Sequence, residues 1–172
     1  SDLVDDRLGA MWRVGSDGTS VLPRLIVAPQ QGEGMSASPY LIATESDWCN
    51  FIYHTQYYGD DYDKKFWKQT ADITTTKWGA CLIGSASTHN TYDGDQHTLT
   101  IDVESVKPFT APFLKAELST IKSLKVKGSL KGGIHSAGLL GQSFQHNLIE
   151  DCLVDADVTF GGRSEEHTSE LQ

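Results

Sequence analysis

The stretch Ile121–Leu130, IKSLKVKGSL, decides the fold, because the spacing of its apolar residues recurs elsewhere in the chain. Its first three apolar residues, Ile, Leu and Val, stand at offsets 0, 3 and 5. The stretch IEDCLV at 149–154 repeats these offsets 28 positions later, and Leu99 and Ile101 match the last two offsets 25 positions earlier. A repeat of roughly 20–50 residues is typical of a solenoid, in which stacked coils bury a core that one coil cannot bury alone.

A second series of short apolar segments interleaves with the first at comparable spacing. It comprises CLIG at 81–84, APFL at 111–114 and GLLG at 138–141. The segments of both series are too short for globular helices, and the chain around them is rich in Thr, Val and Ile, which favour strands. The sequence therefore predicts an all-β solenoid of about three coils, in which two types of strand alternate and like side chains stack in columns.

One helix is predicted before the strands. Thr44 is suited to the N-cap position, and Asp47 stands where the acidic partner of a capping box would be. We expect the helix to run from about 45 to 57. Its buried face is predicted from helical spacing and consists of Trp48, Phe51, Ile52 and Thr55. Such a helix would cover the open end of the column and protect the edges of its strands.

Composition narrows the class of function. The 172 residues carry 14 Lys and Arg against 23 Asp and Glu, for a formal net charge of −9. We therefore expect no nucleic-acid partner, because an acidic surface repels phosphates. No apolar run approaches the roughly 18–20 residues of a membrane-spanning helix, so we expect none. Three cysteines lack the paired spacing of a zinc site, and we expect no metal and no cofactor.

The strand motifs carry a family resemblance. IKSLKVKGSL, followed by Gly138-Leu139-Leu140-Gly141 and then IEDCLV, resembles the repeats of the GLUG-motif family of bacterial surface proteins, in which a Gly-Leu-apolar-Gly turn separates two strands. YDGDQHTLTI at 92–101 resembles a further segment of that family. Ser123 and Asp151 stand where the family usually has Asn. The resemblance implies a right-handed parallel β-helix that is secreted, bound at the cell surface and repeated in tandem, with no catalytic residues.

The resemblance also suggests how the chain is organised. Residues 1–30 resemble the end of a preceding repeat module. The stretch APQQGEGMSASP at 28–39 is rich in Gly, Ser, Pro and Gln, so residues 31–39 are expected to form a linker. Residues 40–162 would be a β-helix module with its cap helix. Residues 163–172, RSEEHTSELQ, resemble a translated sequencing adapter, so we expect a non-native tail on a fragment of a longer bacterial protein.

Asp93, Asp95 and His97 alternate in the stretch at 92–101 and admit two interpretations. A lyase or hydrolase could use the carboxylates and the imidazole as acid and base groups. Asp93-Gly94, however, is a strong turn signal, because Gly tolerates positive φ and Asp bonds the backbone two residues on. We expect a turn that feeds a buried strand, with His97 at the strand entrance and satisfied by a backbone carbonyl.

The cysteines and one acidic loop have structural interpretations. Cys152 is expected to be a buried small hydrophobe in the same slot as Leu124 and Leu99 of neighbouring coils. Whether Cys49 and Cys81 pair is left open by the sequence. The carboxylates in GDDYDKK at 59–65 lack the complete ligand set of a calcium loop, so a solvated loop is favoured.

Residues 48–78 are rich in aromatic side chains, which either stack on sugars or bury over the end of the column. We expect most of these rings to be buried, with Tyr57 and Tyr58 as the best candidates for ligand contact. The sequence thus predicts a non-enzymatic extracellular module for display or attachment to glycans, host surface or matrix. The alternatives are a β-helix polysaccharide lyase or hydrolase, and a stalk without a ligand.

Overall fold

The computed structural model describes residues 12–14, 23–25, 31–57, 65–84, 89–133 and 135–160. Within these ranges the chain forms one α-helix and sixteen β-strands. Two short strands, β1 (Trp12–Val14) and β2 (Pro23–Leu25), pair antiparallel with each other. All other strand pairs in the described part of the chain are parallel.

Three parallel sheets build the domain. The β3 sheet contains β3 (Tyr40–Ile42), β4 (Phe66–Gln69), β7 (Asn90–Asp93), β11 (Ser119–Lys122) and β15 (Leu148–Glu150). The β5 sheet contains β5 (Ile73–Thr75), β8 (Thr98–Glu104), β12 (Lys125–Gly132) and β16 (Leu153–Phe160). The β6 sheet contains β6 (Ala80–Ile83), β10 (Phe113–Glu117) and β14 (Leu140–Phe144). A short fourth pair joins β9 (Phe109–Thr110) and β13 (His135–Ser136).

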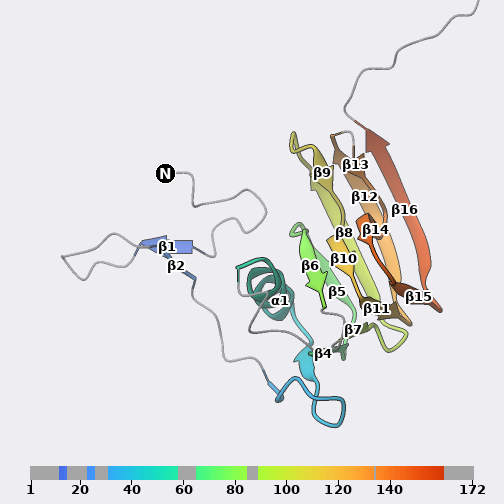
Figure 1. Cartoon of the computed structure of the whole chain (residues 1–172). Helices are drawn as coiled ribbons and strands as arrows, with labels where there is room; N and C mark the ends of the chain where they lie inside the picture. Colours follow the sequence, from blue (N-terminus) through green and yellow to red (C-terminus); the bar gives the residue numbers. More distant parts are fainter. Residues whose placement is uncertain are drawn as a thin grey trace, which may run out of the picture.

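The chain visits the three sheets in order and then returns to the first, which makes a parallel β-solenoid of about four turns (Figure 1). The predicted all-β parallel solenoid with one helix is confirmed. Two details of the prediction are wrong. The solenoid has about four turns rather than three, and its coils are built from three main types of strand rather than two.

The sequence analysis did not predict the third type of strand, because the stretch at 121–130 contains parts of two strands and not one. IKSLKVKGSL bends between β11 and β12 at Ser123, whose φ is 51°. IEDCLV bends in the same way between β15 and β16 at Asp151, also with φ 51°. One residue with positive φ is enough to change the direction of the chain, so no loop separates the two strands. The spacing of apolar residues therefore did not reveal the bend.

The core consists of columns of like side chains from successive coils. Trp67, Tyr92 and Ile121 stack in register in the β3 sheet and are all buried. In the β5 sheet the buried column is Ile73, Leu99 and Val126. Each coil can bury its inward side chains only against the next one, which is why the solenoid gains stability through stacking.

The predicted register between β8 and β12 is wrong by two residues. Leu99 pairs with Val126 and not with Leu124, so the repeat there is 27 residues rather than 25. Four residues, 94–97, separate β7 from β8, whereas only Ser123 and Leu124 separate β11 from β12. A shift of two preserves which face of a strand points inward, so the prediction that Leu99 and Ile101 are buried is still confirmed.

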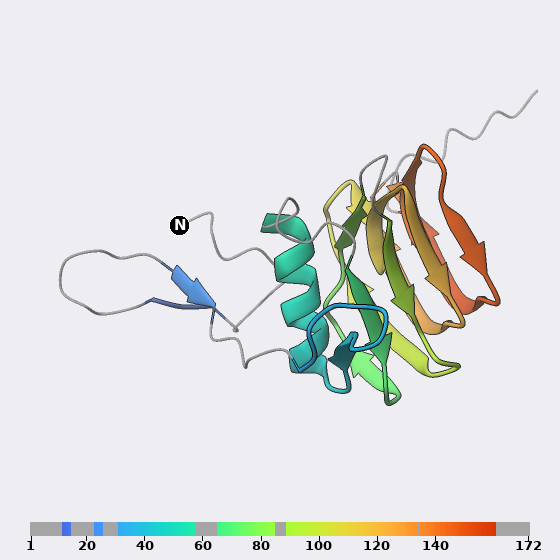
Figure 2. The ribbon, with the colours of Figure 1, turned by 60° about the horizontal axis from the view of Figure 1, so that its bottom comes forward.

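Helix α1 (Glu45–Tyr57) has the bounds and the cap that the sequence predicts. The backbone N–H of Asp47 donates to Thr44 Oγ1 at 3.2 Å, and the N–H of Thr44 donates to Asp47 Oδ2 at 2.9 Å. Its predicted face, Trp48, Phe51, Ile52 and Thr55, is buried. The helix lies across one end of the solenoid, and β16 lies at the other end (Figure 2).

Aromatic rings join α1 to the column. Trp48 packs edge-on against Tyr92 and Phe113, with ring centroids 6.0 and 5.9 Å apart, and Phe51 lies 5.1 Å from Trp67. The prediction that most rings of residues 48–78 bury over the column end is confirmed for Trp48, Trp67 and Trp78. No helix in the described ranges is long and apolar enough to cross a membrane.

Parts of the predicted organisation lie outside what the structure describes. Most of residues 1–30, the acidic loop at 59–64 and the whole of 163–172 are not described. Residues 31–39 are described and contain a tight turn, in which Met35 and Ser38 exchange backbone hydrogen bonds of 3.1 and 3.0 Å.

Candidate functional site

An open groove of about 550 Å³ lies on the outer side of the β6 sheet. We call it the outer groove. Its lining residues come from β10, β14, the segment that leads into β9, and the turn before β6; they are Trp78, Lys107, Pro108, Phe109, Leu114, Lys115, Gln142 and Phe144. The volume falls in the range of about 300–1,000 Å³ that ligand sites occupy.

A β-bulge turns two neighbouring residues of β10 into the groove. Pairing between β10 and β6 is interrupted between Phe113 and Lys115, so that Phe113 and Ala116 remain buried in the core. Between them, Leu114 is half-buried against the edge of the core and Lys115 is exposed, and both line the outer groove. Bulges re-aim side chains in this way because one strand carries an extra residue. The backbone of β10 therefore presents an apolar and a cationic group side by side.

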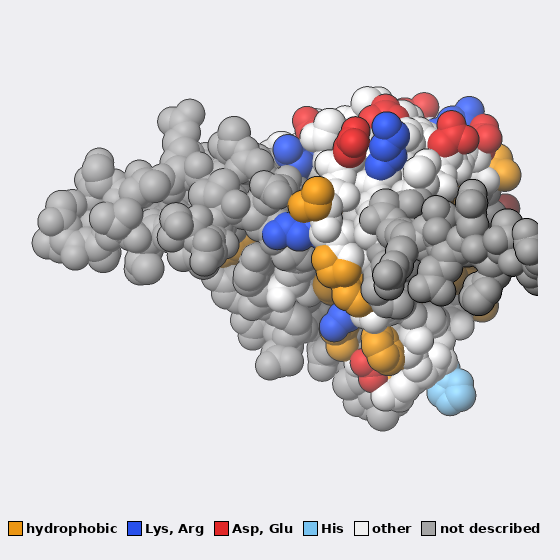
Figure 3. Space-filling view, turned by 90° about the horizontal axis from the view of Figure 1, so that it is seen from above, with side chains coloured by type: hydrophobic (Ala, Val, Ile, Leu, Met, Phe, Trp, Pro, Cys, Tyr) orange, Lys and Arg blue, Asp and Glu red, His pale blue; other side chains and the backbone are white. Residues whose placement is uncertain are grey.

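The outer groove combines rings with cations. Phe144 is 45% exposed and Phe109 is half-buried, whereas Trp78 is only 2% exposed and contributes packing rather than an open ring face. The side chains of Lys107 and Lys115 are exposed, and within the described ranges neither ammonium group has a carboxylate partner. Hydrophobic and cationic side chains lie next to each other on the surface seen in Figure 3. An anionic ligand with an apolar face fits this arrangement.

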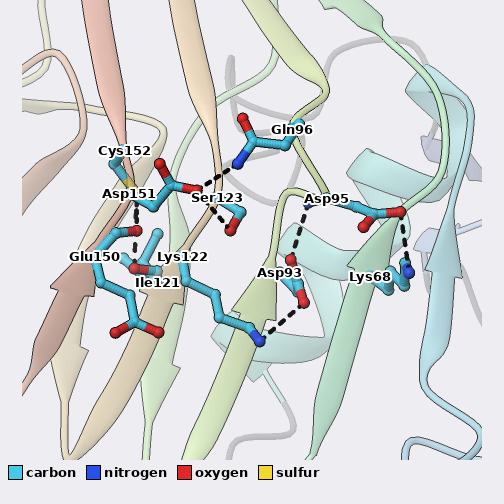
Figure 4. Close-up of polar contacts among 10 residues, drawn as sticks. All are labelled: Lys68, Asp93, Asp95, Gln96, Ile121, Lys122, Ser123, Glu150, Asp151 and Cys152. Atoms are coloured by element: carbon cyan, nitrogen blue, oxygen red, sulfur yellow. Dashed lines mark hydrogen bonds and ion pairs between the residues drawn. The ribbon is translucent and has the colours of Figure 1, made fainter.

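The predicted turn at Asp93 and Asp95 is confirmed, and its carboxylates point apart (Figure 4). The N–H of Asp95 donates to Asp93 Oδ1 at 2.9 Å, which is the expected bond two residues on. Asp93 then pairs with Lys122 at 3.1 Å, and Asp95 pairs with Lys68 at 3.0 Å. Each carboxylate thus ties β7 or its corner to a different neighbouring coil, and the two do not converge on one reacting atom.

Gly94 lies in the turn, as predicted, but the predicted reason for a glycine there, a positive φ, is wrong. It is not among the glycines with positive φ; Asp95 and Gln96, with φ of 48° and 66°, adopt that conformation instead. A Cβ at Gly94 would lie 2.6 Å from Leu124 Cα and from the carbonyl oxygen of Ser123. Glycine is required because the next coil approaches this backbone closely.

His97 lies at the entrance of β8, as predicted, but a carboxylate rather than a carbonyl contacts its ring. Nδ1 of His97 lies 3.3 Å from Asp72 Oδ1. The same oxygen accepts the backbone N–H of Thr98 at 2.8 Å, and this bond, followed by the contact with His97, holds the pKa of Asp72 below its usual value. The His97 side chain is half-buried and that of Asp72 is exposed, and the pair fixes the start of β8.

The GLLG motif and Cys152 have structural positions in the last coil. Leu140 starts β14 and pairs with Phe113, and the Leu139 carbonyl accepts the N–H of Phe113 at 3.0 Å. Gly138 and Gly141 flank these residues, and a Cβ at Gly138 would lie 2.5 Å from Val154 Cγ1. Cys152 occupies the slot of Leu124, as predicted, but not the slot of Leu99, because of the two-residue shift in register. The prediction that it is buried is wrong, because Cys152 is half-buried, whereas Leu124 is fully buried.

The cysteine thiols are shielded rather than activated. Burial, reinforced by the charge of Glu45, raises the pKa of the Cys49 thiol to about 12. Burial also raises the pKa of Cys152. Cys49 and Cys81 are not joined by a disulfide in the described structure. No group of three or more His, Cys, Asp or Glu side chains gathers in a metal-binding arrangement in the ranges that the structure describes.

The candidate ligand contacts that the sequence suggests, Tyr57 and Tyr58, stay predictions. Tyr58 lies outside the described residues, and the backbone of Tyr57 ends α1 while its side chain is not described. The residues of the outer groove were not singled out, because their spacing shows no motif. The only signal was two apolar residues, Leu114, which is half-buried on β10, and Phe144, which is exposed on β14, and their place becomes clear once the register is known.

No protein-family model, no characterised protein and no solved structure matches this chain. The comparisons therefore supply no function, and the likeness to the GLUG-motif family rests on the motifs quoted above. What is established is the β-solenoid.

Proposed function

We propose that this chain is a non-enzymatic, surface-displayed solenoid module that binds an acidic glycan in the outer groove. A stiff stack of coils suits display, because backbone hydrogen bonds run along its whole length. The motifs shared with bacterial surface proteins support a secreted, tandemly repeated setting. The module would then hold its groove away from the cell and attach to host, matrix or neighbouring-cell polysaccharide.

The observation that carries the proposal is the pair of lysines beside exposed rings. In a chain with a formal net charge of −9, three other lysines, Lys68, Lys122 and Lys131, have carboxylate partners. Lys107 and Lys115 have none among the described residues, although they flank the same groove. Two cations of this kind attract anions, and Phe109 and Phe144 offer apolar contact to a sugar ring.

The absence of catalysis is part of the proposal and is supported by how the outward charges of the β5 sheet are used. Lys131 pairs with Glu104 at 3.6 Å, and Asp102 accepts the N–H of Ser129 at 2.9 Å. These groups link neighbouring coils, and β-helix lyases and hydrolases would need such residues to face a substrate instead. A reducing-end assay on the bound polysaccharide tests this point, since any steady release of new ends would contradict a binding module.

The direct test is a glycan array followed by calorimetric titration of the full 172-residue chain. We expect binding to uronate-containing or sulfated oligosaccharides and at least tenfold weaker binding to their neutral counterparts. Lys107→Gln/Lys115→Gln should weaken binding by about two- to thirtyfold, since each of the two exposed ion pairs contributes about 0.2–1 kcal/mol and 1.4 kcal/mol is tenfold. Phe144→Ala should weaken it further without changing the salt dependence.

Lys127→Gln is the matched control, because Lys127 is also exposed and lies outward on β12, away from the groove. It removes the same charge and should leave affinity within about twofold, because a single distant surface charge is largely screened. Equal losses from Lys127→Gln and from the groove lysines would show that binding follows net charge and not this site. No binding to any acidic glycan would contradict the proposed ligand class and favour a stalk without a ligand.

A further inference from the structure

A second hollow, of about 300 Å³, lies on the far side of one wall of the outer groove, and we call it the neighbouring hollow. Its lining comes from the ends of β8 and β12, from the residues that directly follow them, and from Thr159 of β16. In Figure 1 these strand ends lie at the edge of the sheets where β9 and β13 begin. The volume is at the lower end of the range that ligand sites occupy, so the neighbouring hollow suits part of a ligand rather than a whole one.

Residues 105–108 form the wall between the two hollows. Ser105 and Val106 line the neighbouring hollow, whereas Lys107 and Pro108 line the outer groove. Four residues span at most about 14 Å, because an extended chain advances about 3.3–3.6 Å per residue. The two hollows therefore lie within reach of one short oligosaccharide.

This wall is fixed to the next coil at two points. The N–H of Ser105 donates to the Lys131 carbonyl at 2.9 Å, and the N–H of Gly133 donates to the Lys107 carbonyl at 2.9 Å. Between these points Val106 is 94% exposed. The wall thus holds an apolar side chain in a defined place on the rim of the neighbouring hollow, where it can cover an apolar patch of a ligand.

The two hollows differ in charge. The outer groove holds Lys107 and Lys115, which have no carboxylate partner among the described residues. The charged groups of the neighbouring hollow are Lys131 and Glu104, which form an ion pair and cancel. Their charged atoms are 3.6 Å apart, beyond the about 2.7–3.2 Å of a good N–H···O bond, and both side chains are more than half exposed. A sugar hydroxyl can accept from the ammonium group and donate to the carboxylate.

We propose that the neighbouring hollow binds an uncharged sugar unit next to the acidic unit in the outer groove, so that the ligand is a polysaccharide in which acidic and neutral units alternate. This inference rests on the function proposed above and narrows its class of ligand. An all-acidic chain would bring a second negative charge beside Glu104, and like charges repel. A hydroxyl that bridges Lys131 and Glu104 leaves that link between coils in place and requires no proton transfer, in keeping with a module that binds and does not cleave.

The test compares two oligosaccharides of equal length by calorimetric titration of the full 172-residue chain. In one of them uronate alternates with a neutral hexose, and in the other every unit is uronate. We expect the alternating oligosaccharide to bind about fivefold more tightly or better, because its hydroxyls gain hydrogen bonds in the neighbouring hollow. Attraction to Lys107 and Lys115 alone would favour the uniform oligosaccharide, which carries more negative charge, so the expected order is opposite to that of a simple charge effect.

Glu104→Gln/Lys131→Gln should abolish this preference and leave the affinity for the uniform oligosaccharide within about twofold. The variant removes one charge of each sign, so the net charge of the chain does not change. Lys68→Gln/Asp95→Asn is the matched control, because it removes another exposed ion pair, of 3.0 Å, in the corner after β7. It should leave the preference as it is. Circular dichroism checks that each variant is folded.

The outcomes separate this inference from the proposed function. If both oligosaccharides bind equally, if the uniform one binds more tightly, or if Glu104→Gln/Lys131→Gln keeps the preference, this inference is overturned and the outer groove stands as the site of an acidic glycan. If neither oligosaccharide binds, the proposed ligand class is wrong and this inference falls with it. Lys107→Gln/Lys115→Gln should weaken the binding of both.

Discussion

Single residues with positive φ form the corners of this solenoid. Ser123 and Asp151 turn equivalent corners, and Asp95 with Gln96 makes the longer corner of the coil below. Each such residue costs of order 1 kcal/mol, and the stacking of corners offsets this cost. The Gln96 N–H donates to the Ser123 carbonyl at 2.8 Å, and Ser123 Oγ in turn donates to Asp151 at 3.2 Å. The corners thus form a ladder of their own.

Polar side chains form a second ladder between coils, which the sequence analysis did not predict. Asn90 and Asn147 precede or start equivalent strands, with Ser119 between them in register. Asn90 Oδ1 accepts the N–H of Lys65 at 2.8 Å, and Asn147 Oδ1 accepts the N–H of Ser119 at 3.0 Å. These polar side chains satisfy backbone groups between coils. They escaped sequence reasoning because polar residues do not enter an apolar repeat.

Gly128 offers the sharpest stability prediction at this scale. Its φ is 110°, and a Cβ there would lie 2.3 Å from the Ile101 carbonyl oxygen. Gly128→Ala should lower the free energy of unfolding by about 3 kcal/mol or more, because the backbone of the coil below cannot move aside. Urea-induced unfolding measures the change.

Gly138→Ala is the matched control for Gly128. It is also crowded, but its Cβ would meet the end of the half-exposed Val154 side chain, which can shift. We expect a loss of about 1 kcal/mol or less at Gly138. Equal effects at the two positions would mean that the φ and the backbone contact at Gly128 are described wrongly.

At the scale of elements, α1 shows why some parts of the fold are predictable. Its start is encoded locally by Thr44 and Asp47, and its buried face by a period that no strand shares, so the bounds and the face were both confirmed. The sequence also predicted that Leu99 and Ile101 point to the buried face of their strand. Register was not predictable, because a period of two looks the same after a shift of two, and the longer corner at 94–97 has no apolar signal.

The docking of α1 makes stability depend on pH. Burial lowers the pKa of His54 below its usual value of 6.5, so the folded chain favours the neutral ring. Above pH 6.5 the ring is neutral in both states. As pH falls below about 6.5, the unfolded chain takes up a proton that the folded chain refuses, and the free energy of unfolding decreases until the lower folded pKa is passed.

His54→Gln should therefore flatten the dependence of unfolding free energy on pH as pH falls from about 6.5. His146→Gln is the control, because His146 is exposed at the corner before β15. Denaturant unfolding at a series of pH values measures both. If His146→Gln flattens the profile as much as His54→Gln does, the burial of His54 on α1 is not its cause. Asp72, whose pKa is lowered, adds a separate loss only as pH falls below about 3.8.

At the scale of the whole molecule, the end of the solenoid beside α1 and the side groove have different chemistries. The end beside α1 is aromatic and is covered by that helix. The side groove sets Lys107 and Lys115 beside aromatic rings. Composition predicted only an acidic molecule, because the position of a charge relative to the coils depends on register.

The central claim is that an acidic glycan binds in the outer groove, and a chemical-shift map of the isotope-labelled chain tests it most directly. On addition of an acidic oligosaccharide, the account predicts that the amide shifts of Lys107, Phe109, Lys115 and Phe144 move in a saturable way, while those along α1, including Tyr57, do not. Shifts confined to α1 and the residues after it, or no saturable shifts at all, would contradict the claim.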